Sequence, residues 1–382
     1  MRLAMVALSC PAGGMLHYSS QLANALSRDT DLAFYTPWQP DLATYFDRRI
    51  ALRRIVPLNR AGDRKGLLTR QVNPFLHLAT ARQILRHQPG IVHLVTDHPA
   101  NSLVVRALRL LGHRAVVLTH HDPVRHPGET SRLKDVLTGM TVAAADRVVV
   151  HGDTLARDLA AQGVPSTKVV AIPHGDYGFL RRHASGAPEE PLILCFGRIL
   201  PYKGLDVLCR AERLLGDQLG EYRICIAGAG DPACFAGEIG PSGRVSVRAE
   251  FLPDAEVASL FERARLVVLP YTQATQSGVL AVAFAFGKPA IVSDVGGLPE
   301  AVGYGRAGRI VPAGDPAALA AAIAGLWHDP AARAALGQAG RERISAEIGW
   351  PIVASRHLEM YRDLGSKGAS STLPVRAAPS GS

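Results

Sequence analysis

Short runs of hydrophobic residues alternate along the chain with longer segments that have helical periodicity. In the first half the runs have the length of strands and read "RLAMVALS", "LAFYT", "IVHLV", "AVVLTH", "RVVVH" and "KVVAIP". Strands that alternate with helices predict βαβ units, because neighbouring parallel strands need a crossover connection. The first half is therefore expected to form a parallel sheet covered by helices.

The same alternation begins again after residues 181–191. This segment, "RRHASGAPEEP", is polar, rich in small residues and proline-bearing, which is typical of a linker. The strand-like runs that follow are "PLILCFG", "YRICIAGAG", "RVSV", "RLVVLP" and "PAIVSD". The pattern predicts an α/β protein with two Rossmann-like, doubly wound parallel-sheet domains that face each other across a cleft.

The sequence predicts that the chain is divided into four segments. Residues 1–183 form the first domain and residues 184–349 the second, while residues 350–365 form an amphipathic terminal helix that packs back on the first domain. Residues 366–382 have the composition of a disordered tail. A length of 382 residues fits two cores of moderate size.

Composition excludes several classes of protein. Hydrophobic residues make up 47% of the chain, yet no unbroken apolar stretch has the length of a membrane span, and the N-terminus lacks the pattern of a signal peptide. A cytoplasmic location is expected. The 5 cysteines are scattered without a CxxC pair, which favours buried free thiols over disulfides or a zinc site.

Positive charge is concentrated in one part of the first half. The net charge is +9, and residues 48–86 hold ten lysines and arginines. Such a stretch is typical of a solvated face, and it is also suited to peripheral contact with an anionic membrane or to an acidic acceptor. No nucleic-acid-binding signature accompanies the charge, so no nucleic acid partner is expected.

Two loops of the first half carry candidate site residues. Gly13 and Gly14 follow the first strand and permit close approach of a ligand to backbone N–H groups. The loop "THHDPVRH" follows another strand, and we assign His121 to the substrate and His120 to packing. Adjacent histidines on an extended chain point in opposite directions, so a metal ion shared by this pair is not expected.

In the second half, the loop "FGRILPYKG" predicts an anion site. Arg198 and Lys203 bracket a short loop before a helix, beside Gly197 and Gly204. A guanidinium, an ammonium and a helix N-terminus all favour the same diphosphate.

Other loops add weaker candidates for ligand binding. They contribute the backbone of Gly230, the backbone around Phe251 and Leu252, and the carboxylate of Glu300. An acid in the first turn of a helix is also favoured by the helix dipole, so Glu300 has a structural explanation as well. Asp254 has the position of a helix N-cap. The stretch "PYTQATQSGVLAVAFAFGKP" combines a polar run with a helix start, as expected of an anion site, but it contains no acid.

The order of these loops resembles that of the GT-B glycosyltransferases, and within them glycosyltransferase family 4. The matching pieces run from residue 1 to about residue 364 and include "THHD", "FGRILPYKG", "IAGAGDP" and "GKPAIVSDVGGLPEAV". The resemblance implies a nucleotide-sugar donor on the second domain, a glycan, lipid-linked or small-molecule acceptor on the first, and transfer with retention of anomeric configuration. It implies catalytic roles for His121, Arg198 and Lys203, with no metal or other cofactor.

The chain departs from the family at two positions. The family carries two glutamates separated by seven residues, and this chain has Ala274 and Val282 in their places. Three explanations remain open: an anion site built from the backbone of residues 277–279 with polar contacts from Thr275, Gln276 and Ser277, an unusual donor, or a weakly catalytic relative. The donor-binding set expected is Gly13, Gly14, Gly197, Gly230, Phe251, Leu252, Thr275, Gln276, Ser277, Gly278, Val279 and Glu300.

Two other functions compete with sugar transfer. The same fold serves nucleotide-sugar epimerases and phosphorylases, so the fold alone does not separate the reactions. A non-catalytic glycan-binding or assembly protein is the third candidate, and the acid-free loop at residues 270–289 is its support.

Overall fold

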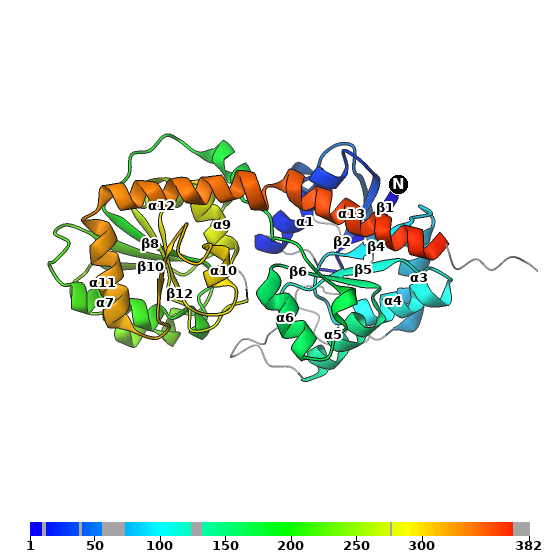
Figure 1. Ribbon diagram of the computed structural model, residues 1–382, viewed down its shortest axis with the longest axis horizontal. Coiled ribbons are helices and arrows are strands. Elements are labelled where there is room, and N and C mark those ends of the chain that lie inside the picture. Colours follow the sequence, from blue (N-terminus) through cyan, green and yellow to red (C-terminus); the bar gives the residue numbers. More distant parts are fainter. Residues whose placement is uncertain (10–12, 38–39, 56–72, 124–131, 276, 370–382) are drawn as a thin grey trace, which may run out of the picture.

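The computed structural model describes residues 1–9, 13–37, 40–55, 73–123, 132–275 and 277–369. It contains two parallel sheets, each covered by helices, as Figure 1 shows. The first sheet has seven strands in the order β3-β2-β1-β4-β5-β6-β7 and the second has six in the order β10-β9-β8-β11-β12-β13. Every strand pairing is parallel.

The strands and helices of the first half follow the predicted alternation. Its strands are β1 (Arg2–Val6), β2 (Asp31–Pro37), β3 (Ala51–Ile55), β4 (Ile91–Leu94), β5 (Val116–Thr119), β6 (Arg147–Val150) and β7 (Val169–Ala171). Its helices are α1 (Gly14–Leu26), α3 (Pro74–Leu85), α4 (Asn101–Leu110), α5 (Arg132–Ala144) and α6 (Asp153–Ala161). The sequence pattern missed β3, because this edge strand exposes Arg53 and Arg54 and so lacks a hydrophobic run.

The second half repeats the plan. Its strands are β8 (Leu192–Phe196), β9 (Arg223–Ala227), β10 (Val245–Arg248), β11 (Leu266–Leu269), β12 (Ala290–Ser293) and β13 (Arg309–Val311). Its helices, and the one that follows, are α7 (Leu205–Leu215), α8 (Asp254–Arg263), α9 (Gly278–Ala285), α10 (Leu298–Ala301), α11 (Pro316–Trp327), α12 (Pro330–Arg343) and α13 (Trp350–Ala369). The short edge strand β13 was not predicted from the sequence.

Alternation of side chains divides each half into two core layers. In β1, Leu3 and Met5 belong to the cluster on one face of the sheet, while Ala4 and Val6 belong to the cluster on the other. Successive side chains of a strand point to opposite faces, so a strand covered on both sides is a continuous hydrophobic run. This is why the strands were visible in the sequence.

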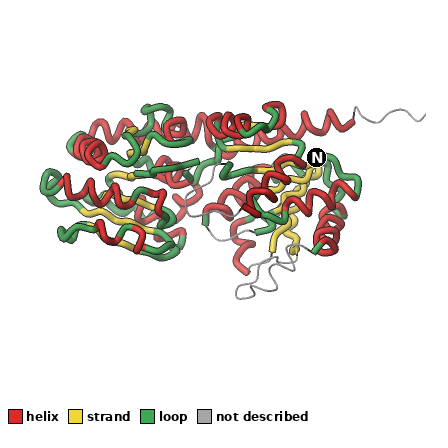
Figure 2. The backbone as a smooth tube through the Cα atoms, turned by 90° about the horizontal axis from the view of Figure 1, so that it is seen from below, coloured by secondary structure: helices red, strands yellow, loops and turns green. Residues whose placement is uncertain are grey.

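The terminal helix α13 belongs to the core of the first half. Val353, Leu358 and Tyr361 are buried with residues of α1 and β1. The Tyr361 hydroxyl lies 2.6 Å from Nδ1 of His93, a buried histidine in β4. Figures 1 and 2 show the chain crossing from the second half to the first through α12 and α13, so that the last helix lies along the first domain.

In each of the two sheets, the strand order reverses at one point. β1 lies beside β4 in the first sheet, and β8 lies beside β11 in the second. In doubly wound sheets, ligands bind beyond the carboxyl ends of the strands at such a point. The loops after β1, β4, β8 and β11 are therefore the places where a site is expected.

Candidate active site

The loop after β8 holds the two predicted cations. Lys203 Nζ lies 3.8 Å from the centre of the Tyr271 ring and 5.0 Å from that of Tyr202, which fixes the ammonium by cation–π contacts. Burial lowers the pKa of Lys203, whereas Tyr202, Cys195 and, least of all, Asp122 act in the opposite direction. Arg198 is exposed, so its guanidinium is accessible to a ligand.

Glycines give this loop its shape. Gly204 has a φ of 63°, and a Cβ there would overlap the carbonyl oxygen of Pro270 in the loop after β11. Gly230 has a φ of 147° and packs against Ile199, whose N–H donates to Ala229 at 2.8 Å. The role of Gly230 seen in the structure is thus to support the loop that carries Arg198.

The start of α9 lies beside that loop. A Cβ on Gly197 would stand 3.4 Å from the Val279 side chain, so the α9 N-terminus is adjacent to Arg198. Ser277 is the N-cap of α9, but its hydroxyl contacts Tyr271 at 3.2 Å and makes no cap hydrogen bond to the helix. The backbone of Gly278 packs against Tyr177. Helix N–H groups and two cations therefore converge, as an anion site requires.

The two positions of the missing glutamates have different surroundings. Val282 is buried in the apolar cluster that includes Leu280 and Phe284, with 3% of its surface exposed. Ala274 is half-buried, and its carbonyl packs against Gly296. The Val282 position therefore offers no polar contact to a ligand, as expected for an apolar side chain at the place of a glutamate.

Thr275 makes its hydrogen bond across the domains. Its hydroxyl donates to Oδ1 of Asp122 at 2.6 Å, and the residue is 1% exposed. The predicted polar contact from Thr275 to a donor is thus replaced in this structure by a contact to an acid of the first domain. Gln276 lies outside the described residues.

The loop after β5 places its two histidines apart, as predicted. His120 Nδ1 lies 3.0 Å from Oδ1 of Asp97, and the backbone N–H of His121 donates to Oδ2 of the same carboxylate at 2.9 Å. Burial alone would raise the pKa of Asp97, but these two partners outweigh it and the pKa is lowered. Asp97, in the loop after β4, was not found by sequence reasoning.

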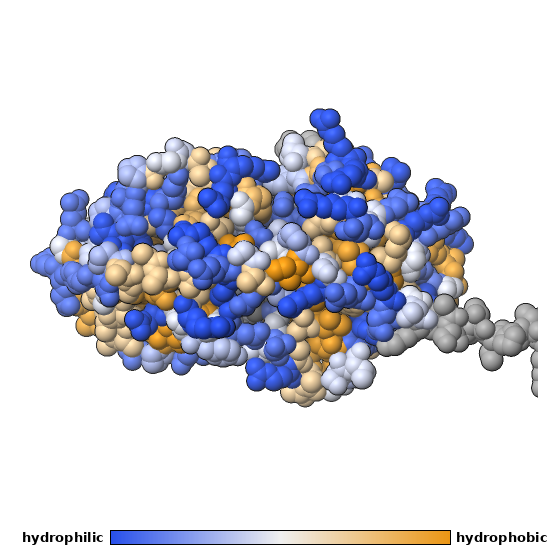
Figure 3. Space-filling model, turned by 45° about the horizontal axis from the view of Figure 1, so that its top comes forward, coloured by the Kyte–Doolittle hydropathy of each residue, from blue (hydrophilic) through white to orange (hydrophobic). Residues whose placement is uncertain are grey.

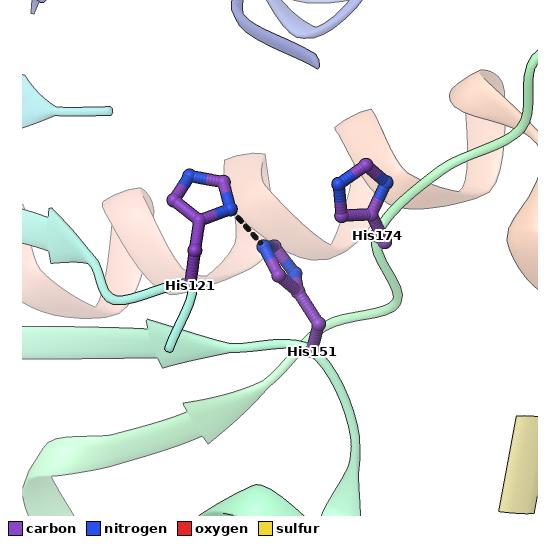
Figure 4. Close-up of side chains that lie close together, drawn as sticks. All are labelled: His121, His151 and His174. Carbon is purple, nitrogen blue, oxygen red and sulfur yellow. Dashed lines mark hydrogen bonds between the residues drawn. The ribbon is translucent and has the colours of Figure 1, made fainter. Parts of the chain in front are cut away.

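His121 is held by two contacts inside the first domain. Its Nε2 lies 3.0 Å from the carbonyl oxygen of Val95, and its Nδ1 lies 3.0 Å from Nε2 of His151. His174 lies beside this pair, as Figure 4 shows. The sequence carried a signal for this cluster, since β5, β6 and β7 are each followed closely by a histidine, and strand ends of a parallel sheet meet at one edge.

The loop after β1 faces the second domain. A Cβ on Gly13, whose φ is 90°, would lie 3.4 Å from the ring of Phe251, and one on Gly14 would lie 3.5 Å from the Tyr177 hydroxyl. Phe251 is 58% exposed, which leaves its ring available for stacking, whereas Leu252 is buried in the core. A contact from Leu252 to a ligand is therefore restricted to its backbone.

Two further predicted residues join the domains. Asp254 is the first residue of α8, and its carboxylate lies 3.1 Å from Nε2 of His17 in α1, so the expected N-cap role is replaced by an interdomain contact. Glu300 accepts hydrogen bonds from the N–H groups of Asp153 and Thr154 at 2.9 Å each and from the Thr154 hydroxyl at 2.7 Å. Its carboxylate caps α6 in this structure instead of facing open space.

Comparisons with known proteins agree with this geometry. A family model described as "Glycosyltransferase Family 4" matches residues 12–175, and one described as "Glycosyl transferases group 1" matches residues 190–329. A D-inositol 3-phosphate glycosyltransferase of Mycobacterium avium is 31% identical over 312 residues, which cover 72% of this chain and 70% of that one.

Two other relatives differ in coverage. A D-inositol 3-phosphate glycosyltransferase of Streptomyces avermitilis is 32% identical over 244 residues, but the match spans only 58% of this chain and about half, 52%, of that relative. A phosphatidyl-myo-inositol mannosyltransferase of Mycobacterium leprae is 27% identical over 384 residues, covering 97% of this chain and 98% of that one.

Solved structures share the fold. The sucrose-phosphate synthase of Thermosynechococcus elongatus has a TM-score of 0.76 at 22% identity and covers 96% of this chain and 100% of that one. The Anabaena protein HepE, solved in complex with UDP, has a TM-score of 0.73 at 17% identity and covers 95% of this chain and 100% of that one. The expectation of two Rossmann-like domains in the GT-B arrangement is confirmed.

Proposed function

Since this chain belongs to glycosyltransferase family 4, we propose that it transfers a sugar from a nucleotide-sugar donor to an acceptor with retention of anomeric configuration. The observation that carries the proposal is the convergence of Arg198, Lys203 and the α9 N-terminus at the point where the second sheet reverses its strand order. This is the place where a doubly wound sheet binds an anionic ligand.

The proposed site has the charges that the reaction needs. Breaking the bond between sugar and diphosphate leaves negative charge on the leaving group, and fixed cations stabilise that charge as it develops. Lys203 is already held between two tyrosine rings, so little reorganisation is required when the charge appears. Because these two side chains supply the positive charge, we propose that transfer proceeds without a metal ion or other cofactor.

Asp122 is the proposed acid of the site. The second domain lacks the family's carboxylates at positions 274 and 282, but Asp122 of the first domain reaches the same loop through Thr275 at 2.6 Å. Its charge also acts on Lys203. An acid beside the reacting centre would bind a sugar hydroxyl, which is the role that the missing side chains leave open.

The acceptor proposed is a glycan, lipid-linked or small molecule held by the first domain. The Mycobacterium leprae relative is named for a lipid acceptor, phosphatidyl-myo-inositol. Among the described residues of the basic stretch, the exposed arginines are Arg48, Arg49, Arg53, Arg54, Arg82 and Arg86, while residues 56–72 lie outside the described part. We include peripheral contact with an anionic membrane, at the inner face and from the cytoplasm, in the proposal.

That contact would be electrostatic. Within the described residues, none of the helices has the length and apolarity needed to cross a bilayer. Hydrophilic residues cover most of the face seen in Figure 3, with hydrophobic residues in small separate groups. Binding to anionic liposomes should therefore weaken steeply as salt is added, and sedimentation that does not respond to salt would contradict this part of the proposal.

A panel of nucleotide sugars tests the donor site. A ligand that binds only the folded state raises the unfolding temperature, so a matching donor should stabilise the protein in a concentration-dependent way. Incubation of protein with that donor alone separates the alternatives: isomerised donor would indicate an epimerase, and slow hydrolysis would indicate a transferase. Failure of every nucleotide sugar to bind would favour the non-catalytic alternative.

A further inference from the structure

Three histidines that follow consecutive strands of the first sheet, two of them buried and one half-buried, form a cluster outside the anion site. His121 follows β5, His151 follows β6 and His174 follows β7. One ligand nitrogen from each lies within 4.8 Å of the other two, and Figure 4 shows the three rings side by side. The Tyr18 ring packs against all three, with centroid distances between 4.8 and 5.1 Å.

The hydrogen bonds of this cluster fix which nitrogens carry protons. A carbonyl oxygen only accepts, so Nε2 of His121 must donate to Val95 and Nδ1 of His151 must donate to Ile172, 3.2 Å away. A neutral imidazole has one N–H group. The remaining nitrogens, Nδ1 of His121 and Nε2 of His151, therefore present lone pairs to each other at 3.0 Å.

A positive centre beside the two nitrogens, within reach of both lone pairs, relieves the repulsion between them. An additional proton would make a buried imidazolium, which burial disfavours. A metal ion instead uses both lone pairs of neutral imidazoles, and carbonyl groups that accept from the opposite nitrogens are the usual second set of contacts around metal-bound histidine. Two nitrogens bound to a tetrahedral zinc ion at about 2.0–2.1 Å are about 3.3 Å apart. The nitrogens of His121 and His151 are 3.0 Å apart, while separations within the cluster reach up to 4.8 Å, so one ring must move closer when an ion binds.

His174 provides the third nitrogen. One of its ring nitrogens lies within 4.8 Å of the ligand nitrogens of His121 and His151. The centre of its ring lies 4.8 Å from that of His151. We propose that His121, His151 and His174 form a binding site for a divalent transition-metal ion of the zinc type.

The nature of the ligands selects the class of ion. Imidazole nitrogen suits Zn²⁺, Co²⁺, Ni²⁺ and Cu²⁺, whereas Mg²⁺ and Ca²⁺ prefer oxygen. Three protein ligands leave a fourth position for water. Because the family resemblance places His121 near the donor sugar, an ion that takes its Nδ1 would compete with the sugar, so bound zinc should inhibit transfer; only this consequence rests on the proposed function.

Cobalt binding to the tag-free full chain tests the proposal. After removal of metals with EDTA, Co²⁺ should bind one ion per chain and give the visible absorption bands of a tetrahedral nitrogen site, and Zn²⁺ should displace it. His151→Gln and His174→Gln should each weaken Co²⁺ binding by more than about tenfold. Loss of a residue that only hydrogen-bonds to a metal ligand already lowers metal affinity by about tenfold or more. His113→Gln is the matched control, since this half-buried histidine contacts its own neighbour Ala115 and should leave binding unchanged.

The outcomes are separable from sugar transfer. Absence of visible bands in the unaltered protein, or equal Co²⁺ affinity in the double variant His151→Gln/His174→Gln, would overturn the proposal whether or not the protein is a transferase. Circular dichroism and the unfolding temperature check that each variant is folded. If His151→Gln does not fold, the Co²⁺ affinity of His174→Gln alone is compared with that of the unaltered protein and the control, because His174 is half-buried and its replacement disturbs the core less.

Discussion

At the scale of single residues, the Thr275 hydroxyl connects the two domains at the candidate site. It donates to Asp122 at 2.6 Å from a position that is 1% exposed, and the charge of Asp122 acts on Lys203. The Thr275 hydroxyl therefore fixes the Asp122 carboxylate of the first domain against the loop after β11.

Replacing Thr275 by valine removes the hydroxyl while keeping the shape of the side chain. A hydrogen bond to a charged group contributes about 1.5–3 kcal/mol. Because Asp122 is exposed, we expect an effect at the lower end of this range, which corresponds to a fall in the rate of transfer of about tenfold. Steady-state kinetics measure this effect, with Thr141→Val as the control because its hydroxyl donates to the carbonyl oxygen of Leu137 in its own helix.

A double-mutant cycle separates two roles of Thr275. If the hydroxyl positions Asp122, the loss in Thr275→Val/Asp122→Asn should be close to that of Asp122→Asn alone. If it binds the donor directly, as the sequence predicted, the two losses should add and the donor Kd should rise with Thr275→Val.

Sequence reasoning succeeded for some residues and failed for others for physical reasons. Arg198 and Lys203 could be predicted because both cations lie on one short loop between glycines. The cluster of His121 with His151 and His174 was missed because its members are far apart in the chain and meet only through strand order. Asp122 was noticed beside the histidines, but its contact with Thr275 depends on how the domains meet.

At the scale of elements, the loop from β8 to α7 depends on Gly204. Its φ of 63° is in the left-handed region, and its Cα packs against the Pro270 carbonyl of the neighbouring loop. Helix α7 begins at Leu205, so this one glycine both starts the helix and brings the cation loop against the loop after β11.

Gly204→Ala should displace the cation loop. The added methyl overlaps the Pro270 carbonyl and the backbone is strained, so we expect the free energy of unfolding to fall by more than about 1 kcal/mol, together with donor affinity. Urea unfolding and donor titration measure the two effects.

Gly216→Ala is the matched control. This glycine also has positive φ, 48°, but a Cβ there meets no atom of the described chain within 4 Å. It should show backbone strain without loss of donor affinity. Equal donor affinity in the Gly204 variant and the unaltered protein would refute the role given to this contact.

The elements themselves were largely predictable. Strands buried on both faces appear as hydrophobic runs, which is why β1 and β8 were found, whereas the short edge strands β3 and β13 have weaker patterns. Cap and contact roles were less predictable: Asp254 contacts His17 instead of capping its own helix, because the partner comes from the other domain.

At the scale of the whole molecule, polar contacts hold the two domains together. Besides Asp122 and Thr275, His17 contacts Asp254, and Glu300 accepts three hydrogen bonds from the start of α6. The α6 N-cap residue Gly152 has no side-chain cap, so a carboxylate from the second domain serves as the cap. The relative position of the domains therefore depends on charge.

This contact should depend on pH. Burial alone would raise the pKa of Glu300, but hydrogen bonds from Thr154 and Asp153 outweigh it, and the pKa is lowered in the folded protein. The stabilisation is thus complete above the ordinary glutamate pKa of about 4.3 and is lost as the pH falls through the lower folded value. Glu300→Gln should lower the free energy of unfolding by about 1 kcal/mol at pH 7 and by less below pH of about 4.

Chemical unfolding at several pH values measures this difference. Glu359→Gln is the control, since this exposed glutamate of α13 makes one 3.5 Å contact with Ser355 of its own helix. A difference between the Glu300 variant and the unaltered protein that stays constant from pH 7 to 3.5 would contradict a role for the ionised carboxylate.

The central claim is that Arg198 and Lys203 bind the diphosphate of a nucleotide sugar. Once a stabilising donor has been identified, calorimetric titration of that donor into the unaltered protein, Arg198→Ala and Lys203→Ala tests it most directly, with Lys168→Ala as a control outside the site. We expect donor affinity to fall in both site variants and turnover to fall by about 100-fold or more, the effect of removing one group that stabilises developing charge. Undiminished donor affinity and turnover in both folded variants would contradict the account.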